Sequence, residues 1–188
     1  NSDTLSPSWH GALPWLAAAS VALAIGTAVR QHGSTTLTVD PPLAAHAELL
    51  DEFAVRHARP LPPEETDPAR VTRVFSPIVG VPVRPVAMND VLQRGTYAFA
   101  GARLMPLSND SAATLFYEKA GGGQRVTVFV FDPARISVRN SCCLAPRVVS
   151  VDGQPRTLMV GHAKGYSLAV AEHDGIGYAV SADLQEQD

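Results

Sequence analysis

Uncharged positions dominate the start of the chain, before alternating patterns take over. Residues 11–29 contain no charged side chain, and Arg30 closes the stretch. A helix of that length rises about 28 Å, close to the roughly 30 Å hydrocarbon core of a bilayer. The preceding ten residues contain Asp3 but no Lys or Arg, whereas an export signal begins with cations. The pattern therefore predicts a single transmembrane helix over residues 11–30, with a buried Ala-rich helix of a soluble core as the alternative.

Small residues and tryptophans give this predicted span two further features. Ala18, Ala22 and Gly26 recur every four residues, and small side chains at that spacing let membrane helices pack closely. This stripe predicts a helical partner in the membrane; an Ala-rich composition without an interface is the alternative. Trp9 and Trp15 are the two tryptophans of the chain, and indole rings favour the membrane–water boundary. We expect both to anchor the leading end of the span.

The pattern after the span changes from polar to amphipathic. Residues 31–42 are mostly polar and end in two prolines, which is typical of a tether. Apolar residues at helical spacing then run through 43–59 with charged residues between them, and this predicts an amphipathic helix of about four turns. A proline-rich stretch ends that helix. Asp67 before Pro68 is a typical N-cap, so a second, short helix is expected through about Phe75.

Strand-like patterns begin only after a proline-rich segment, which cannot lie in the interior of a sheet. Residues 76–86 contain three prolines, which remove the donors that a central strand needs. Residues 97–107 are strand-like, and two β-rich runs flank the three glycines at 121–123, where positive φ permits a hairpin turn. Two further runs, 165–173 and 175–183, meet at Asp-Gly, which is a strong hairpin signal.

One of these runs has apolar residues on both of its faces. Val126, Val128 and Val130 alternate with three residues that point the other way: Thr127, Phe129 and Phe131. A strand with two apolar faces is buried on both sides, so we expect it to be central in its sheet.

The elements together predict an α+β fold. A single N-terminal transmembrane helix is followed by one or two lead-in helices and an antiparallel β-sheet. About 155 residues follow the span, enough for one domain with its own core. The expected organisation is a tail at 1–10, a transmembrane helix at 11–30, a tether at 31–42 and an extracytoplasmic domain at 43–188.

The order of the segments along the chain is itself informative. After the span come AAHAELL, DPARVTRVF, VPVRPV, GARLMPL, an AATLFYE…RVTVFVF hairpin and a closing GYSLAVAEHDGIGYAVSADL. In this order, between about Trp15 and Leu184, the chain resembles the extracytoplasmic part of bacterial transmembrane anti-sigma factors. That resemblance implies an inner-membrane protein with most of its chain in the periplasm. Charge alone predicts the opposite topology, because Arg30 is the one cation close to the span. We follow the resemblance.

The chain departs from that family at two places. The family binds its sigma factor through a cytoplasmic domain ahead of the span, often with a His/Cys zinc motif, and only ten residues precede the span here. The family often has a tryptophan before the last turn, where this chain has Ala171 and Glu172. A sigma factor is therefore an expected partner only if an upstream domain exists.

The candidate chemical groups are few. Cys142 and Cys143 are adjacent and are read as plain loop cysteines, with a redox pair or a metal site with His162 and His173 as alternatives. His46 and His57 fall on one face of the first helix and are expected to pack or to snorkel rather than to coordinate a metal. A hydrolytic site is the remaining alternative, drawn from Ser167, Asp174, His162 and His173. No Gly-x-Ser-x-Gly elbow is present, so neither an enzyme nor a cofactor is expected.

Charge and architecture leave two classes of function. The net charge is −3 without a basic block, so nucleic acid is not an expected partner. One class is the sensor half of a transmembrane anti-sigma factor. The other, which we favour, is a non-catalytic accessory or scaffolding subunit whose extracytoplasmic domain docks on a bacterial membrane protein complex, such as a respiratory or photosynthetic assembly.

Overall fold

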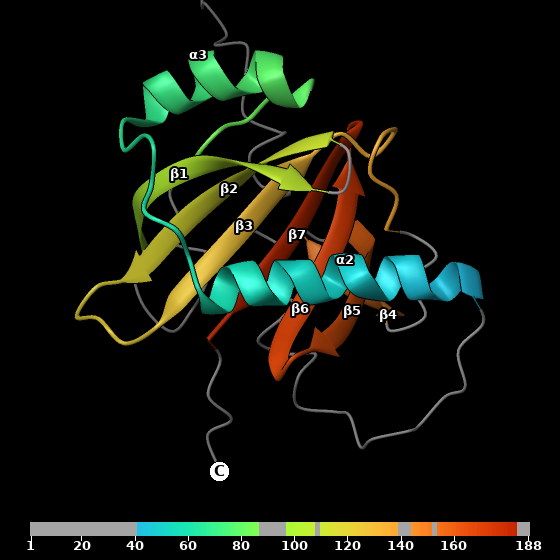
Figure 1. Cartoon of the computed structure of the whole chain (residues 1–188). Helices are drawn as coiled ribbons and strands as arrows, with labels where there is room; N and C mark the ends of the chain where they lie inside the picture. Colours follow the sequence, from blue (N-terminus) through green and yellow to red (C-terminus); the bar gives the residue numbers. More distant parts are fainter. Residues whose placement is uncertain (1–40, 87–96, 108–109, 139–143, 152–153, 184–188) are drawn as a thin grey trace, which may run out of the picture.

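The computed structural model describes residues 41–86, 97–107, 110–138, 144–151 and 154–183. This part of the chain has the predicted α+β class, with two helices followed by seven antiparallel strands (Figure 1). The helices are α2 (Pro41–Ala58) and α3 (Pro68–Val79). The strands are β1 (Tyr97–Leu107), β2 (Asp110–Lys119), β3 (Arg125–Phe131), β4 (Leu144–Val151), β5 (Gln154–Ala163), β6 (Tyr166–His173) and β7 (Ile176–Ala182).

The sheet is built from two meanders that meet at its centre. Its strand order is β1-β2-β3-β7-β6-β5-β4, so consecutive strands pair as hairpins and the last strand, β7, pairs with β3. Val128 of β3 lies opposite Val180 of β7. The predicted central position of β3 is therefore confirmed.

The two helices cover opposite faces of the sheet. Val126, Val128 and Val130 share a buried cluster with the apolar side of α3, whereas Phe129 and Phe131 pack with α2. On the α2 face, the ring centroid of Phe53 lies 4.6 Å from that of Phe129 and 6.1 Å from that of Phe131. Figure 1 shows α2 lying across β5, β6 and β7, and α3 beside β1 and β2.

Helix α2 begins inside the segment predicted to be a tether. Pro41 and Pro42 form its first turn, two residues earlier than expected, because a proline is tolerated where the N–H has no helical partner. The predicted tail, the predicted span at 11–30 and the rest of the tether lie outside the described residues. Within the described part, neither helix is long and apolar enough to cross a membrane.

Helix α3 starts as predicted and ends one turn later. The Asp67 side chain accepts a hydrogen bond from the backbone N–H of Ala69 at 2.9 Å, which is the expected N-cap. The helix continues past Phe75 because Val79 extends the same buried stripe. It stops at Gly80, whose φ of 87° is the left-handed conformation that favours glycine.

Glycines with positive φ form three of the turns between strands. Residues 121–123 all have positive φ, and so do Asp174 and Gly175, as the two predicted hairpins require. Lys164 and Gly165 form a third turn of this kind, between β5 and β6. The sequence pattern had not predicted strands β4 and β5.

The two edges of the sheet differ. The backbone of Glu65 pairs with that of Ala102 in β1, with N–H···O distances of 3.1 and 2.7 Å, so the chain covers this edge itself. At the opposite edge β4 pairs with β5, and no other described strand pairs with it. Val148 of β4 is 72 % exposed, the largest exposure of any described large apolar side chain. Both edge strands contain a proline, Pro106 in β1 and Pro146 in β4, as is usual for strands at an edge.

Candidate functional site

Most of the residues predicted to carry function lie outside the described part of the chain. These are the tryptophan anchors, the small-residue stripe and the cysteine pair: Trp9, Trp15, Ala18, Ala22, Gly26, Cys142 and Cys143. Their roles stay predictions. Within the described ranges, no group of three or more His, Cys, Asp and Glu residues is placed to hold a metal ion.

The four residues of the hydrolytic alternative do not converge on one site. Ser167 and His162 are cross-strand neighbours on β6 and β5, with Oγ and Nδ1 3.5 Å apart. His173 and Asp174 contact each other at the other end of β6, with Nε2 and Oδ2 3.3 Å apart. His173 follows Ser167 by six positions along β6, about 20 Å at about 3.3 Å per residue. The structure therefore gives no Ser–His–Asp arrangement from these residues.

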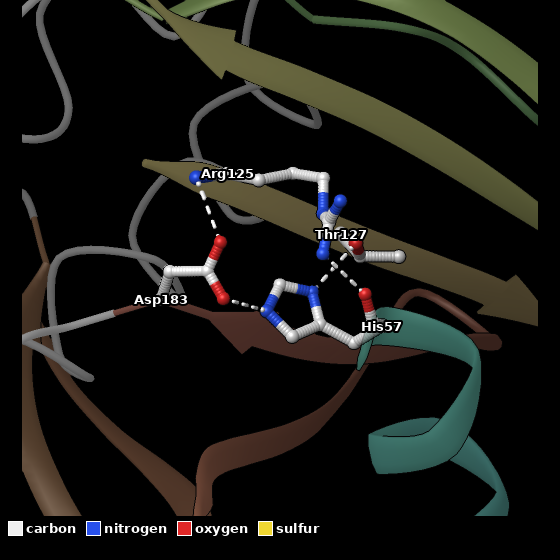
Figure 2. A network of polar contacts seen from close by, with 4 residues as sticks. All are labelled: His57, Arg125, Thr127 and Asp183. Carbon is white, nitrogen blue, oxygen red and sulfur yellow. Dashed lines mark hydrogen bonds and ion pairs between the residues drawn. The ribbon is translucent and has the colours of Figure 1, made fainter. Parts of the chain in front are cut away.

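A buried polar group surrounds His57, in the last turn of α2. Its side chain is fully buried. Nδ1 lies 2.8 Å from Oγ1 of Thr127 in β3, and Nε2 lies 2.9 Å from Oδ1 of Asp183, directly after β7 (Figure 2). The ring of Tyr166 stands edge-on to the imidazole, with centroids 5.0 Å apart. Of the two placements expected for this histidine, packing and snorkelling, the structure shows packing.

Arg125 completes what we call the His57 network, which consists of His57, Thr127, Arg125 and Asp183. Its guanidinium donates a hydrogen bond to the backbone carbonyl of His57, one of the carbonyls that the end of α2 leaves without a helical partner. Its backbone N–H donates to Oδ2 of Asp183 at 3.2 Å, and its carbonyl accepts from the Asp183 N–H at 3.0 Å. Figure 2 shows the cation and the carboxylate on two sides of the imidazole.

Burial sets the charge state of His57. It lowers the pKa of the imidazole below its ordinary value, the negative charge of Asp183 opposes that shift, and the positive charge of Arg125 adds to it. The neutral ring then has one donor and one acceptor nitrogen. Since a carboxylate only accepts, Nε2–H donates to Asp183 and Nδ1 accepts the hydroxyl proton of Thr127.

The order Thr127–His57–Asp183 has the form of a nucleophile, a base and an orienting acid. Thr127, however, is fully buried in the central strand beneath α2, so a substrate has no route to its hydroxyl oxygen. The arrangement instead joins three separate elements: the end of α2, the first half of β3 and the end of β7. Its chemical role is to hold the helix on the sheet.

The partners of His57 do not follow from the sequence pattern. Thr127 and Asp183 lie 70 and 126 residues away along the chain, and only the pairing of β3 with β7 brings them together. One signal was present, because Thr127 is a polar residue on an otherwise apolar strand face. A buried hydroxyl needs a hydrogen-bonding partner from another element.

A second feature is a cavity of about 320 Å³ between the segment after β3 and the strands β5, β6 and β7. Its walls are mainly apolar, and none of the predicted site residues lines it.

Comparison of the chain with protein-family models, with curated proteins and with solved structures finds no match. The resemblance to transmembrane anti-sigma factors therefore stays a prediction.

Proposed function

We propose that this chain is a non-catalytic, single-pass membrane protein that serves as an accessory or scaffolding subunit. Residues 11–30 anchor it in the bacterial inner membrane, and its α+β domain docks, on the periplasmic side, onto an integral membrane protein complex. The observation that carries the proposal is the difference between the two edges of the sheet.

The β1 edge is occupied by the chain itself. Besides the pairing of Glu65 with Ala102, the Arg103 guanidinium donates to the carbonyl of Pro62 at 3.0 Å, and the backbone N–H of Leu104 donates to the Glu64 carboxylate at 3.1 Å. These contacts occupy the middle of the β1 edge, at residues 102–104.

The β4 edge has the properties of a docking surface. Among the described residues no strand covers it, and Val148 projects with 72 % of its surface exposed. An edge strand presents backbone donors and acceptors to which an extended segment of another protein can pair. A neighbouring apolar side chain adds contact area that is buried only in the complex. These features support docking of a partner segment along β4.

The fixed position of α2 suits the same role. Leu50 and Phe53 are buried against the sheet, and the His57 network holds the last turn of the helix. A domain joined to its leading helix in this way holds the β4 edge at a constant orientation to the start of α2. A subunit that must present one surface to a neighbour in the membrane benefits from such a rigid connection.

Co-purification from native membranes in a mild detergent tests the proposal, with the full chain as bait. Val148→Lys places a charge on the proposed surface, and Val55→Lys, at a 47 % exposed position on α2, is the matched control. We expect stoichiometric recovery of an integral membrane assembly with the wild type and with V55K, and its loss with V148K. Both variants should unfold at the wild-type temperature. Equal recovery with V148K, or no stoichiometric partner for the wild type, would contradict the proposal.

The second candidate function is the sensor half of a transmembrane anti-sigma factor. The observation that favours it is the His57 network. Its hydrogen bonds join the end of α2 to β3 and to Asp183 after β7, so a displacement of either strand would also displace the helix. The same purification separates the two functions. A sigma factor recovered with the full-length protein supports the sensor, whereas a large membrane assembly without one supports the accessory subunit.

A further inference from the structure

The cavity beside Phe131 lies one strand in from the β4 edge, since its lining residue Thr157 is the cross-strand partner of Val148. No residue of β4 lines it, and docking along β4 does not explain it. It opens where β3 ends and β7 begins, and one of its walls consists of Pro133, Ile136, Ser137 and Val138. At about 320 Å³ it falls at the lower end of the size range of small-molecule pockets.

The inner part of this cavity is apolar and its mouth is polar. Phe131, Ile136 and Val170 line the inside and are 0, 4 and 2 % exposed, and the flexible side chain of Met159 joins them. The mouth carries the exposed side chains of three polar residues: Ser137, Thr157 and Glu172. An apolar cavity gives water few hydrogen bonds, so it favours an apolar occupant.

At one wall of the cavity the Phe131 ring packs directly against the backbone of Gly177. A Cβ at this position would lie 2.3 Å from Cε2 of Phe131, which is closer than real side-chain contacts allow. Only the absence of a side chain at Gly177 lets the Phe131 ring lie flat against the start of β7. On the α2 face the same ring stacks with Phe53 at an interplanar angle of 26°. Phe131 is therefore held between α2 and β7 and cannot turn to fill the neighbouring space without losing both contacts.

We propose that this cavity is a binding site for a small, neutral, apolar molecule. Its volume holds an aromatic or branched aliphatic body of up to about fifteen non-hydrogen atoms at the packing density of protein interiors. No charged side chain lines the inner part, so burying a charged group there would cost free energy without compensation. Glu172 at the mouth offers no attraction to an anion. No residue of β4 lines the cavity, although Val148 is the cross-strand partner of Thr157 at its mouth. The inference rests on the lining residues alone and not on the proposed function.

Photolabelling of the full chain with 3-trifluoromethyl-3-phenyldiazirine tests the site. This probe is neutral and apolar and is within the size limit, and its carbene inserts into whatever lies next to it on irradiation. We expect labelled peptides to come from the segment that contains Phe131 and Ile136 and from the β5 segment that contains Met159. An excess of 1-naphthol should abolish this labelling, whereas an excess of 1-naphthoate, which carries a carboxylate on the same ring system, should not.

Two tryptophan variants test whether the labelled probe is bound inside the cavity. Ser137→Trp places an indole in the mouth, whereas Ala134→Trp places the same ring at an exposed position of the same turn that does not line the cavity. Both positions are exposed, so both variants should keep the wild-type unfolding temperature. Loss of labelling in S137W with retention in A134W supports the site. Labelling spread over exposed apolar residues remote from the cavity lining, such as Leu61 and Val74, or labelling unchanged in S137W, would overturn it.

Discussion

His57 binds its partners through both ring nitrogens, and the surrounding charges and burial determine which form of the ring is held. Its pKa in the folded protein is lowered by burial, whereas in the unfolded chain it returns to the ordinary value of about 6.5. Between these two values the unfolded chain binds more protons than the folded one. The contribution of His57 to stability is therefore complete above about pH 6.5 and is lost as the pH falls towards the folded-state pKa.

The prediction for this residue compares the wild type with His57→Gln, a variant without a titrating ring at this site. At pH 7.5 the variant should be less stable by about 1–3 kcal/mol, since buried partners lose a hydrogen bond. That difference should shrink as the pH is lowered below about 6.5. Urea unfolding followed by circular dichroism at a series of pH values measures it. A difference that stays constant from pH 7.5 to 5 would show that the ring is protonated in the folded protein as readily as in the unfolded one.

At the scale of elements, α3 depends on its first residues. The Asp67 carboxylate caps the helix, and the helix in turn supplies Val71, Phe75 and Val79 to the core on its face of the sheet. Asp67→Ala should lower the free energy of unfolding by about 1 kcal/mol. Thr66→Ala, at the exposed position just before the cap, is the matched control and should change stability by much less. The account of α3 fails if urea unfolding gives the same midpoint for both variants.

The sequence predicted those helices and turns for which periodicity, capping residues and glycine positions indicate the same element. Both described helices, the hairpin at 121–123, the Asp174–Gly175 hairpin and the central place of β3 follow from periodicity, capping and glycine positions. Strands β4 and β5 were not predicted, because Pro146 and Pro155 interrupt their alternation. A signal was nevertheless present, since an Asp-Gly pair stands between the two runs, as it does between β6 and β7.

The candidate sites were less predictable than the elements. Helical periodicity indicated that His57 packs or snorkels, but Arg125, Thr127 and Asp183 reach it only through the register of β3 with β7. The residues that line the cavity likewise come from four strands and a connecting segment, and no spacing in the sequence marks such a set. The space beside Gly177 becomes visible only when the position of the Phe131 ring is known.

At the scale of the whole molecule, the proposed role depends on the predicted span as well as on the domain. If the stripe of Ala18, Ala22 and Gly26 packs against a neighbouring helix, then Gly26→Leu should weaken incorporation into the complex because a bulky side chain keeps the helices apart. Gly26→Ala keeps the residue small and should retain incorporation. Native gel electrophoresis of solubilised membranes, followed by detection of the chain, compares the two. Comigration of G26L with the complex at the wild-type level would exclude the stripe as an interface.

The central claim is that the β4 edge contacts a partner in the membrane. A photoreactive p-benzoylphenylalanine introduced at Val148, and in a separate variant at Val55, tests it in native membranes. The account predicts that irradiation at Val148 joins the chain to one subunit of an integral membrane complex and that Val55 gives no such product. Absence of a product at Val148, or the same products from both positions, would contradict it.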